Sequence, residues 1–264
     1  MPELPEVETV VRSIGRLKGR RIVTAEFRNL RVLRGGDPDD MAARLQSRRI
    51  AGIKRYGKYI LISLGNGAYL VVHLGMTGRL LLGGAPGKHT HVILTLDRGA
   101  LLFDDSRQFG RFQLSAAFPE RIAKLGPEPL EVPFEDFTAA LKRRKMRIKS
   151  LLLNQDFLRG VGNIYADESL FRAGIHPLAI ASRVRRDRAR RLYDSLIAVL
   201  QEAIAAGGSS VSDYVDAEGR EGFFQLSLRV YQRTGQPCVS CGTPIRRVLV
   251  TQRSSHFCPK CQKR

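Results

Sequence analysis

The sequence predicts an α+β protein in which an antiparallel β-sheet region comes first, a helical region follows, and a small cysteine-rich module ends the chain. Three observations support this order. Short apolar runs separated by turn signals fill residues 21–114, apolar residues recur at helical spacing after residue 130, and all four cysteines lie between residues 238 and 261. The 264 residues are enough for two domains with ample core.

A helix is expected close to the N-terminus. Pro5 suits the first turn of a helix, and Glu6 and Glu8 suit its positive end. Four apolar residues then recur at helical spacing and form one apolar face: Val7, Val10, Val11 and Ile14. The helix is expected to end near residues 15–19 and to anchor the N-terminus against a core, because a reactive group on a fraying end would be useless.

The first three residues, Met1-Pro2-Glu3, contain a candidate nucleophile. Removal of Met1 would leave Pro2 with a free secondary amine, which forms an iminium with an aldehyde-like carbon. A free α-amino group titrates near pH ~8, against ~10.4 for lysine, so it is closer to its neutral, reactive form. The carboxylate of Glu3 is placed to move protons in the same reaction. The alternative is that Pro2 and Pro5 only rigidify the start of the helix.

Residues 21–114 have the pattern of β-strands. Five short segments are rich in Val, Ile, Leu, Tyr and Phe: residues 50–53, 59–64, 69–74, 92–96 and 101–103. Turn signals separate them, among them Gly65-Asn66-Gly67 and Asp97-Arg98-Gly99. The close spacing leaves no room for crossover helices, so a mostly antiparallel sandwich or barrel is expected.

The net charge of +19 indicates a polyanionic partner, and nucleic acid is the first candidate. Solubility alone is a weaker explanation, because the Lys and Arg residues cluster. No apolar run approaches the ~20 residues that span a membrane, and the acidic, proline-containing N-terminus is no secretory signal. A cytoplasmic protein is expected, in which the four cysteines are not structural disulfides.

Several cationic, aromatic or flexible residues interrupt the predicted strands or follow them. They are Lys58, His73, Met76, His89, His91, Arg107, Gln108 and Phe109. Each alone has an ordinary explanation as a surface cation, a core residue or a satisfied histidine. Together they place an apolar residue, an aromatic ring and cations on sheet-edge loops of a basic protein. That combination suits insertion into a base stack, where an apolar wedge replaces a displaced base.

Residues 126–130 have the composition of a linker, and helices are expected after it. Residues 142–149 hold six cations, and the turn 160–163 follows with two glycines before Asn163, a good N-cap residue. A helix N-terminus with exposed N–H groups binds phosphate well. A long helix is expected over residues 187–206, with arginines crowding its start, and residues 216–224 form a polar loop that is flexible by composition.

The four cysteines predict a zinc ribbon. Two Cys-x2-Cys pairs are separated by sixteen residues, and the residues between them alternate like a hairpin with Arg253 at its tip. So small a module has too little core to fold without a metal. The predicted ligands are Cys238, Cys241, Cys258 and Cys261.

At this point the chain resembles the bacterial formamidopyrimidine-DNA glycosylase family. The resemblance rests on residues 1–9, 73–76, 126–130, 160–168 and the four-cysteine ribbon, in order along the whole chain. It implies an N-terminal β-sandwich (1–125), a linker (126–134), a helix–two-turn–helix domain (135–225) and a zinc finger (226–264). It implies excision of oxidised purines, such as 8-oxoguanine and formamidopyrimidines, from double-stranded DNA, followed by β,δ-elimination. A monomer with one structural Zn²⁺ and no membrane partner is expected.

The same resemblance assigns roles by position. Pro2 matches the Schiff-base nucleophile and Glu3 the proton donor. Lys58 matches the proton donor for β-elimination, and Arg253 the finger-tip residue assigned to δ-elimination. The residues that fill the gap left by the flipped base are matched by Met76, Arg107 and Phe109. Other DNA-contacting or phosphate-binding positions are matched by His89, Arg107, Arg144, Lys149, Asn163 and Tyr165. Residues 216–224 lie where the family closes over the damaged base.

The sequence departs from the family's usual Asp-Pro-Arg-Arg-Phe-Gly, because Ser106 replaces the proline and Gln108 the second arginine. The departure leaves the preference for the opposite base open. One alternative is an endonuclease VIII-type glycosylase for oxidised pyrimidines, against which Leu4 and the Arg107-x-Phe109 wedge argue. Another is a non-catalytic binder of damaged DNA. This alternative is disfavoured because the chain keeps all four residues that match catalytic positions: Pro2, Glu3, Lys58 and Arg253.

Overall fold

The computed structural model describes residues 1–211 and 213–264 and divides the chain into two compact units. Unit 1 comprises residues 1–124 and 206–225, and unit 2 comprises residues 125–205 and 226–264. The predicted boundaries placed residues 135–225 in one domain. The structure instead groups 206–225 with unit 1, because Tyr214 and Ala217 lie in the core of unit 1 and the Ala217 carbonyl accepts a hydrogen bond from the backbone N–H of Leu82.

Helix α1 (Leu4–Ile14) confirms the predicted N-terminal helix. Glu3 caps it, and the side chains of Glu3 and Glu6 complete a capping box with each other's backbone. The predicted apolar stripe is buried against the core of unit 1. The short 3₁₀ helix η1 (Gly15–Leu17) follows and ends the helical segment where it was expected.

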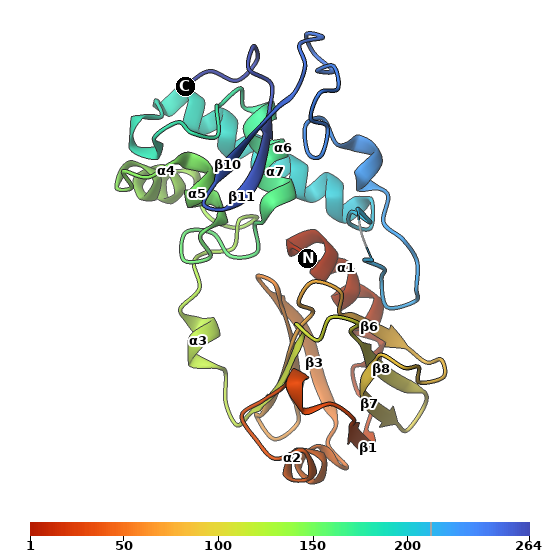
Figure 1. Cartoon of the computed structure of the whole chain (residues 1–264). Helices are drawn as coiled ribbons and strands as arrows, with labels where there is room; N and C mark the ends of the chain where they lie inside the picture. The colour runs from red at the N-terminus through yellow and green to blue at the C-terminus, as the bar shows by residue number, and fades with distance from the viewer. Residues whose placement is uncertain (212) are drawn as a thin grey trace. The chain divides into compact units, whose positions relative to one another are not determined.

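Unit 1 is built on two β-sheets (Figure 1). In spatial order, the first consists of β1 (Ile22–Phe27), β7 (Thr90–Leu96), β8 (Ala100–Asp104) and β6 (Arg79–Leu82). The second consists of β2 (Leu33–Arg34), β9 (Arg111–Ser115), β5 (Tyr69–His73), β4 (Tyr59–Leu64) and β3 (Ile50–Tyr56). All pairs are antiparallel except β2 with β9.

The two sheets share one core, so the predicted sandwich is confirmed. Phe103 of β8 and Phe112 of β9 come from different sheets, and their ring centroids lie 4.8 Å apart. The sequence analysis identified β3, β4, β5, β7 and β8 but not β1, β2, β6 or β9, whose mixed polar and apolar residues reflect partly exposed positions. Short helical segments complete the unit: η2 (Leu30–Val32), α2 (Pro38–Leu45) and α3 (Glu120–Ala123).

Unit 2 contains four helices (Figure 1): α4 (Phe134–Lys142), α5 (Ile148–Leu153), α6 (Asn163–Arg172) and α7 (Arg186–Ala205). The 3₁₀ helix η3 (Ala181–Arg183) precedes α7. One face of α7 is buried at helical spacing, through Leu192, Leu196, Val199 and Ala203. Helix α6 is buried almost all round, because it packs against α5, α7 and β11.

Residues 154–162 join α5 to α6 as a loop of two turns, and hydrogen bonds of one side chain hold the loop together. The side chain of Gln155 donates to the carbonyls of Leu153 and Val161, and it accepts from the N–H of Gly160. Gly126 packs so closely here that an added Cβ would lie 2.6 Å from the Asp156 carbonyl oxygen. The expected linker therefore belongs to the packed structure of unit 2.

The C-terminal module is the hairpin β10 (Arg246–Val250) and β11 (Arg253–Phe257), after the 3₁₀ helix η4 (Phe224–Ser227). Its small core consists of Phe171, Val230, Ile245 and two of the cysteines. Glu168 of α6 ties the preceding segment down by accepting three backbone N–H groups, from residues 229, 230 and 231, at 2.9–3.0 Å. Burial raises the pKa of this carboxyl group despite those bonds.

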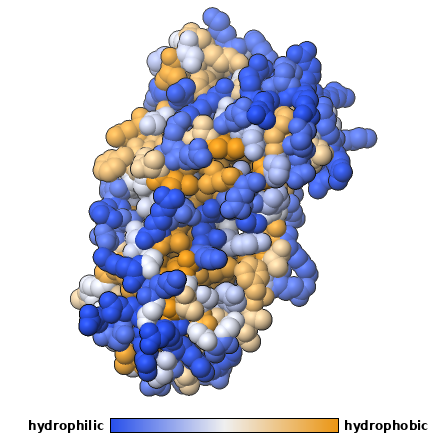
Figure 2. All heavy atoms as spheres, turned by 180° about the vertical axis from the view of Figure 1, so that it is seen from behind, coloured by the Kyte–Doolittle hydropathy of each residue, from blue (hydrophilic) through white to orange (hydrophobic). Residues whose placement is uncertain are grey.

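The surface is dominated by hydrophilic side chains on the face shown in Figure 2, with smaller hydrophobic areas between them. Within the described residues, no helix is long and apolar enough to cross a membrane.

Candidate functional site

The N-terminus is held firmly within unit 1. Pro2 and Glu3 are buried, and the backbone N–H of Glu3 donates to Oε2 of Glu6 at 2.8 Å. The other carboxylate oxygen of Glu6 accepts the N–H of Ser209 at 2.8 Å, and the hydroxyl of Tyr214 donates to the Glu6 carbonyl at 3.2 Å. Glu6 thus ties α1 to the segment 206–225. The sequence analysis assigned Glu6 only to a helix start, although the Glu3–Glu6 capping-box spacing was visible in it.

Charged groups surround this end of the chain. Burial lowers the pKa of the Met1 ammonium group; Glu3 and Glu6 act to raise this pKa, and Lys58 and Arg107 act to lower it. The predicted residues Glu3 and Lys58 are therefore within electrostatic range of the amine. The Pro2 nitrogen, one residue further on, is an amide while Met1 is in place, so it becomes a nucleophilic amine only when Met1 is removed.

Lys58 occupies the two-residue turn between β3 and β4. Gly57 precedes it at φ 59°, a conformation that glycine adopts at little cost and that hairpin turns with glycine first require. The turn leaves the Lys58 side chain only 7% exposed. A surface cation was the ordinary explanation of Lys58 taken alone, but the structure makes it a buried cation within electrostatic range of the Met1 ammonium group.

His73 in β5 was noted in the sequence but not assigned to the site. Burial, followed by the charge of Lys58, lowers its pKa to about 4. Its Nδ1 accepts the N–H of Gly75 at 3.0 Å, and its ring lies 5.0 Å from that of Tyr59. His73 is therefore a neutral ring at physiological pH and adds no second positive charge beside Lys58.

The predicted wedge lies on two loops of unit 1. Met76 is 40% exposed and Phe109 52% exposed, and the Arg107 guanidinium lies 4.9 Å from the centroid of the Phe109 ring. The loops touch at Gly75, where an added Cβ would lie 2.5 Å from the backbone nitrogen of Gly110. Only glycine permits this approach, which brings Met76 and Phe109 together.

Asp105 stiffens the wedge. This buried carboxylate accepts the Thr77 hydroxyl at 2.5 Å and the backbone N–H groups of Arg107 and Gly110 at 3.2 and 2.6 Å. A carboxylate that accepts several N–H and O–H donors fixes the loop around it. Asp105 carries no signal of this role in the sequence, because an aspartate in a turn is ordinary and only the fold shows that its carboxylate bonds to two loops.

The remaining predicted site residues, which are the other DNA-binding candidates and the catalytic candidate Arg253, divide by exposure. His89, Arg144 and Arg253 are exposed, and Asn163 is half-buried. Asn163 is the first helical residue of α6 and Gly162 is the N-cap, which corrects the predicted cap. The Asn163 amide nitrogen donates instead to the carbonyl of Ser254 at 3.0 Å.

Lys149 and Tyr165 are both 0% exposed, so neither is displayed as a surface contact for DNA. Lys149 Nζ lies 2.5 Å from Oδ1 of Asp167, whose side chain is also fully buried. This corrects the expected phosphate contact. The basic run 142–149 suggested a solvated charge, but its last lysine falls on the inward face of α5.

The four cysteines form the predicted metal site. Their sulfur atoms all lie within 4.8 Å of one another, with Cys238–Cys261 at 3.9 Å and Cys241–Cys258 at 3.5 Å. Tetrahedral Zn–S bonds of ~2.3 Å place sulfurs about 3.8 Å apart, so the residues fit zinc and are too far apart for disulfides. Four thiolates leave no open position on the metal, so its contribution is structural.

The thiols themselves show why a cation belongs there. Burial raises the pKa of Cys258 and Cys261, and neighbouring thiols contribute to both shifts, while hydrogen bonds from Thr243 lower that of Cys241 to about 6. Four thiolates side by side repel one another, and a divalent cation reverses that penalty by deprotonating its ligands.

A buried Pro2 with a carboxylate and a lysine close to the N-terminus suits Schiff-base chemistry once Met1 is removed, and an exposed wedge suits DNA from which a base has been extruded. The class is therefore that of DNA glycosylases with lyase activity and a zinc finger. Comparison with known proteins agrees. Residues 1–112 match the formamidopyrimidine-DNA glycosylase N-terminal domain, residues 125–215 its H2TH domain, and residues 235–264 the zinc finger found in FPG and IleRS.

Relatives match over the full length. A formamidopyrimidine-DNA glycosylase of Solibacter usitatus is 73% identical over 264 residues and is covered completely, as is this chain. A solved complex of MutM with carbocyclic 8-oxo-G containing DNA has a TM-score of 0.92 at 36% identity, with 100% of both chains covered. A Lactococcus lactis FPG variant with Fapy-dG containing DNA has a TM-score of 0.91 at 35% identity and equal coverage. The chain belongs to the formamidopyrimidine-DNA glycosylase family.

Proposed function

We propose that this glycosylase excises 8-oxoguanine and formamidopyrimidines from duplex DNA through a Schiff base at Pro2, and then cleaves the strand by β,δ-elimination. The observation that carries the proposal is the anchored N-terminus, in which Pro2 is buried, the backbone N–H of Glu3 donates to Glu6, and Lys58 is within electrostatic range of the Met1 ammonium group. Similar solved proteins hold DNA with the corresponding lesions, which supports the substrate class.

The chemistry requires the Pro2 nitrogen to be free, so Met1 must first be removed. The amine attacks C1′ and the bond from C1′ to the base breaks, and the departing base takes up the proton that the Pro2 nitrogen loses. Glu3 then supplies a proton to the ring oxygen O4′ as the sugar ring opens to the iminium. Loss of a C2′ proton then breaks the bond from C3′ to its oxygen, with Lys58 as proton donor. A second elimination, assigned to Arg253, breaks the bond from C5′ to its oxygen. The burial of Pro2 and Lys58 within unit 1 limits the access of competing solvent to the first steps.

A base inside a duplex hides its glycosidic bond, so the nucleotide must leave the stack. We assign the gap-filling role to Met76, Arg107 and Phe109, whose loops Asp105 and the Gly75–Gly110 contact hold together. Exposed His89 and Arg144, with the half-buried Asn163, are proposed as backbone or phosphate contacts.

The domain assignment and location complete the proposal. Residues 1–125 supply Pro2, Glu3, Lys58 and the wedge. The helical and zinc-finger regions (135–225 and 226–264) follow the 126–134 segment and grip DNA, and the zinc finger also supplies Arg253. The four thiols and the DNA substrate support action in the cytoplasm, at the nucleoid.

Borohydride trapping on an abasic duplex tests the nucleophile. We expect Pro2→Gly to trap poorly, and protein with retained Met1 to trap poorly as well, because its proline nitrogen is an amide. The matched control is Pro5→Ala, which removes the other proline of the same helix start and should trap like wild type. If both proline variants lose trapping equally, the two prolines only rigidify α1. An adduct on a lysine would also refute the assignment, and a lesion panel separates purine from pyrimidine substrates.

A further inference from the structure

Unit 2 contains a buried ion pair that none of the steps above uses. Lys149 of α5 and Asp167 of α6 both have side chains that are 0% exposed. Removing two charges from water costs about as much as their attraction returns, so apolar replacements are often as stable. A reason other than stability is therefore needed for this pair.

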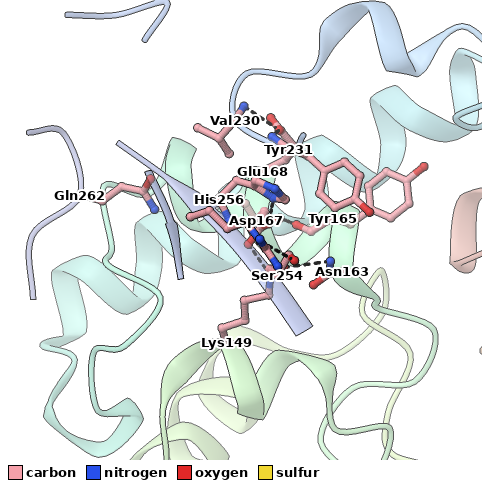
Figure 3. Close-up of polar contacts among 12 residues, drawn as sticks. Lys149, Asn163, Tyr165, Asp167, Glu168, Val230, Tyr231, Ser254, His256 and Gln262 are labelled. Atoms are coloured by element: carbon pink, nitrogen blue, oxygen red, sulfur yellow. Dashed lines mark hydrogen bonds and ion pairs between the residues drawn. The ribbon is translucent and has the colours of Figure 1, made fainter. Parts of the chain in front are cut away.

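Both members of the pair bind strand β11 (Figure 3). Lys149 Nζ and Asn163 Nδ2 each donate to the Ser254 carbonyl at 3.0 Å. Oδ2 of Asp167 accepts the backbone N–H of His256 at 2.9 Å and lies 3.1 Å from its Nδ1. The start of β11 is thus bonded to helices α5 and α6. Of the three side chains that make these bonds, Lys149 and Asp167 are fully buried and Asn163 is half-buried.

The hairpin turn next to these contacts is strained. Val250 pairs with Arg253, so Thr251 and Gln252 form a two-residue turn, at φ 49° and 60°. Such a turn with both residues at positive φ prefers Asn-Gly, and a β-branched threonine is unfavourable there. Strained backbone persists where its surroundings over-determine it, commonly at functional sites. Ser150, beside Lys149, adds one such contact, because its Oγ lies 2.7 Å from Oγ1 of Thr251.

Arg253 is the residue that this arrangement directs. It begins β11 directly before Ser254, and its side chain is exposed. Among the described residues, its guanidinium group has no hydrogen bond or ion pair. The backbone on either side is therefore what determines where the side chain points, and that backbone is held by the contacts above.

We propose that Lys149, Asn163 and Asp167 form a clamp that fixes the strained hairpin turn and so orients Arg253. Lys149 is then a positioning residue and not a phosphate contact. The inference rests on the proposed function, because δ-elimination is assigned to Arg253 there. Catalytic groups need support that holds them to within about half an ångström, which a strained and unsupported turn does not provide.

The test replaces the ion pair as a whole. The double variant Lys149→Met/Asp167→Leu leaves no unpaired buried charge and keeps similar volume. The matched control, Lys145→Met, removes one exposed cation of the same basic run. On an abasic duplex, we expect the double variant to lower the fraction of δ-elimination product about tenfold while Pro2 trapping stays within about twofold. The salt slope of binding to undamaged duplex should not change, and the control should keep the δ fraction.

Amide exchange of residues 250–253 gives a readout independent of activity, and it should quicken in the double variant but not in the control. A rescue distinguishes positioning from damage: Thr251→Asn/Gln252→Gly installs the preferred turn, and should restore most of the δ product in the double-variant background. An unchanged δ fraction with a salt slope lowered by about one unit would mean that Lys149 contacts phosphate. Unchanged amide exchange would also overturn the clamp. If wild type itself neither traps nor cleaves, the proposed function fails, while amide exchange still judges the clamp.

Discussion

Truncation of the wedge should separate base extrusion from strand cleavage. Phe109 is 52% exposed in unit 1, so about half of its surface is free to be buried when it replaces a base. Aromatic side chains bury about 150–250 Å², so about 100 Å² remains, worth roughly 2.5 kcal/mol at ~25 cal/mol/Å². Part of that remains with the alanine Cβ. We therefore expect Phe109→Ala to lower the excision rate on a lesion duplex by about 30-fold, or about 2 kcal/mol.

The assay compares excision from a lesion duplex with cleavage of the matching abasic duplex. The abasic duplex has no base to extrude, so its cleavage should fall only a few-fold. Thermal stability should barely change, because half of the side chain is already in water. Leu30→Ala removes an apolar side chain of unit 1 that is 63% exposed and lies outside the wedge, and should affect neither rate. Equal losses on both substrates would refute the reasoning and make Phe109 an ordinary packing residue.

Two further predictions concern the metal site and pH. Cys258→Ser should release about one zinc per chain and weaken DNA binding while unit 1 stays folded, because the ribbon has its own small core. Metal analysis together with near-UV spectra checks this. Full DNA binding by zinc-free protein would contradict it. The pKa of His73 is about 4 in the folded protein, below its ordinary value of 6.5. As the pH falls, the unfolded chain therefore binds this proton before the folded protein does, and stability is lost between about pH 6.5 and about pH 4. The loss should be roughly 3 kcal/mol, measured by denaturant unfolding at pH 7 and pH 4, relative to His73→Asn, whose Oδ1 can still accept from Gly75. A variant with the same pH dependence as wild type would show that this histidine titrates normally.

Much of the molecule follows from local sequence. The spacing of the two Cys-x2-Cys pairs is enough to predict the sulfur cluster. Thiolates are soft ligands and the chain has only these four cysteines, so one metal ion is expected to bind all four. The valine and isoleucine stripe of α1, its Pro5 and its acidic first turn determine that helix, because each acts within one or two turns. The close spacing of apolar runs predicts antiparallel pairing for the same reason, as each turn joins neighbouring strands.

Only the tertiary structure decides which charges lie inside. Lys149 and Lys145 stand in one basic run and look alike in sequence, yet the helical phase of α5 buries the first beside Asp167, which is eighteen residues further along the chain. Asp105 and Glu6 are ordinary turn and helix-start acids until the fold brings Thr77 to one and Ser209 to the other. Burial and long-range hydrogen bonding depend on the whole chain, and they give identical residue types different partners and roles.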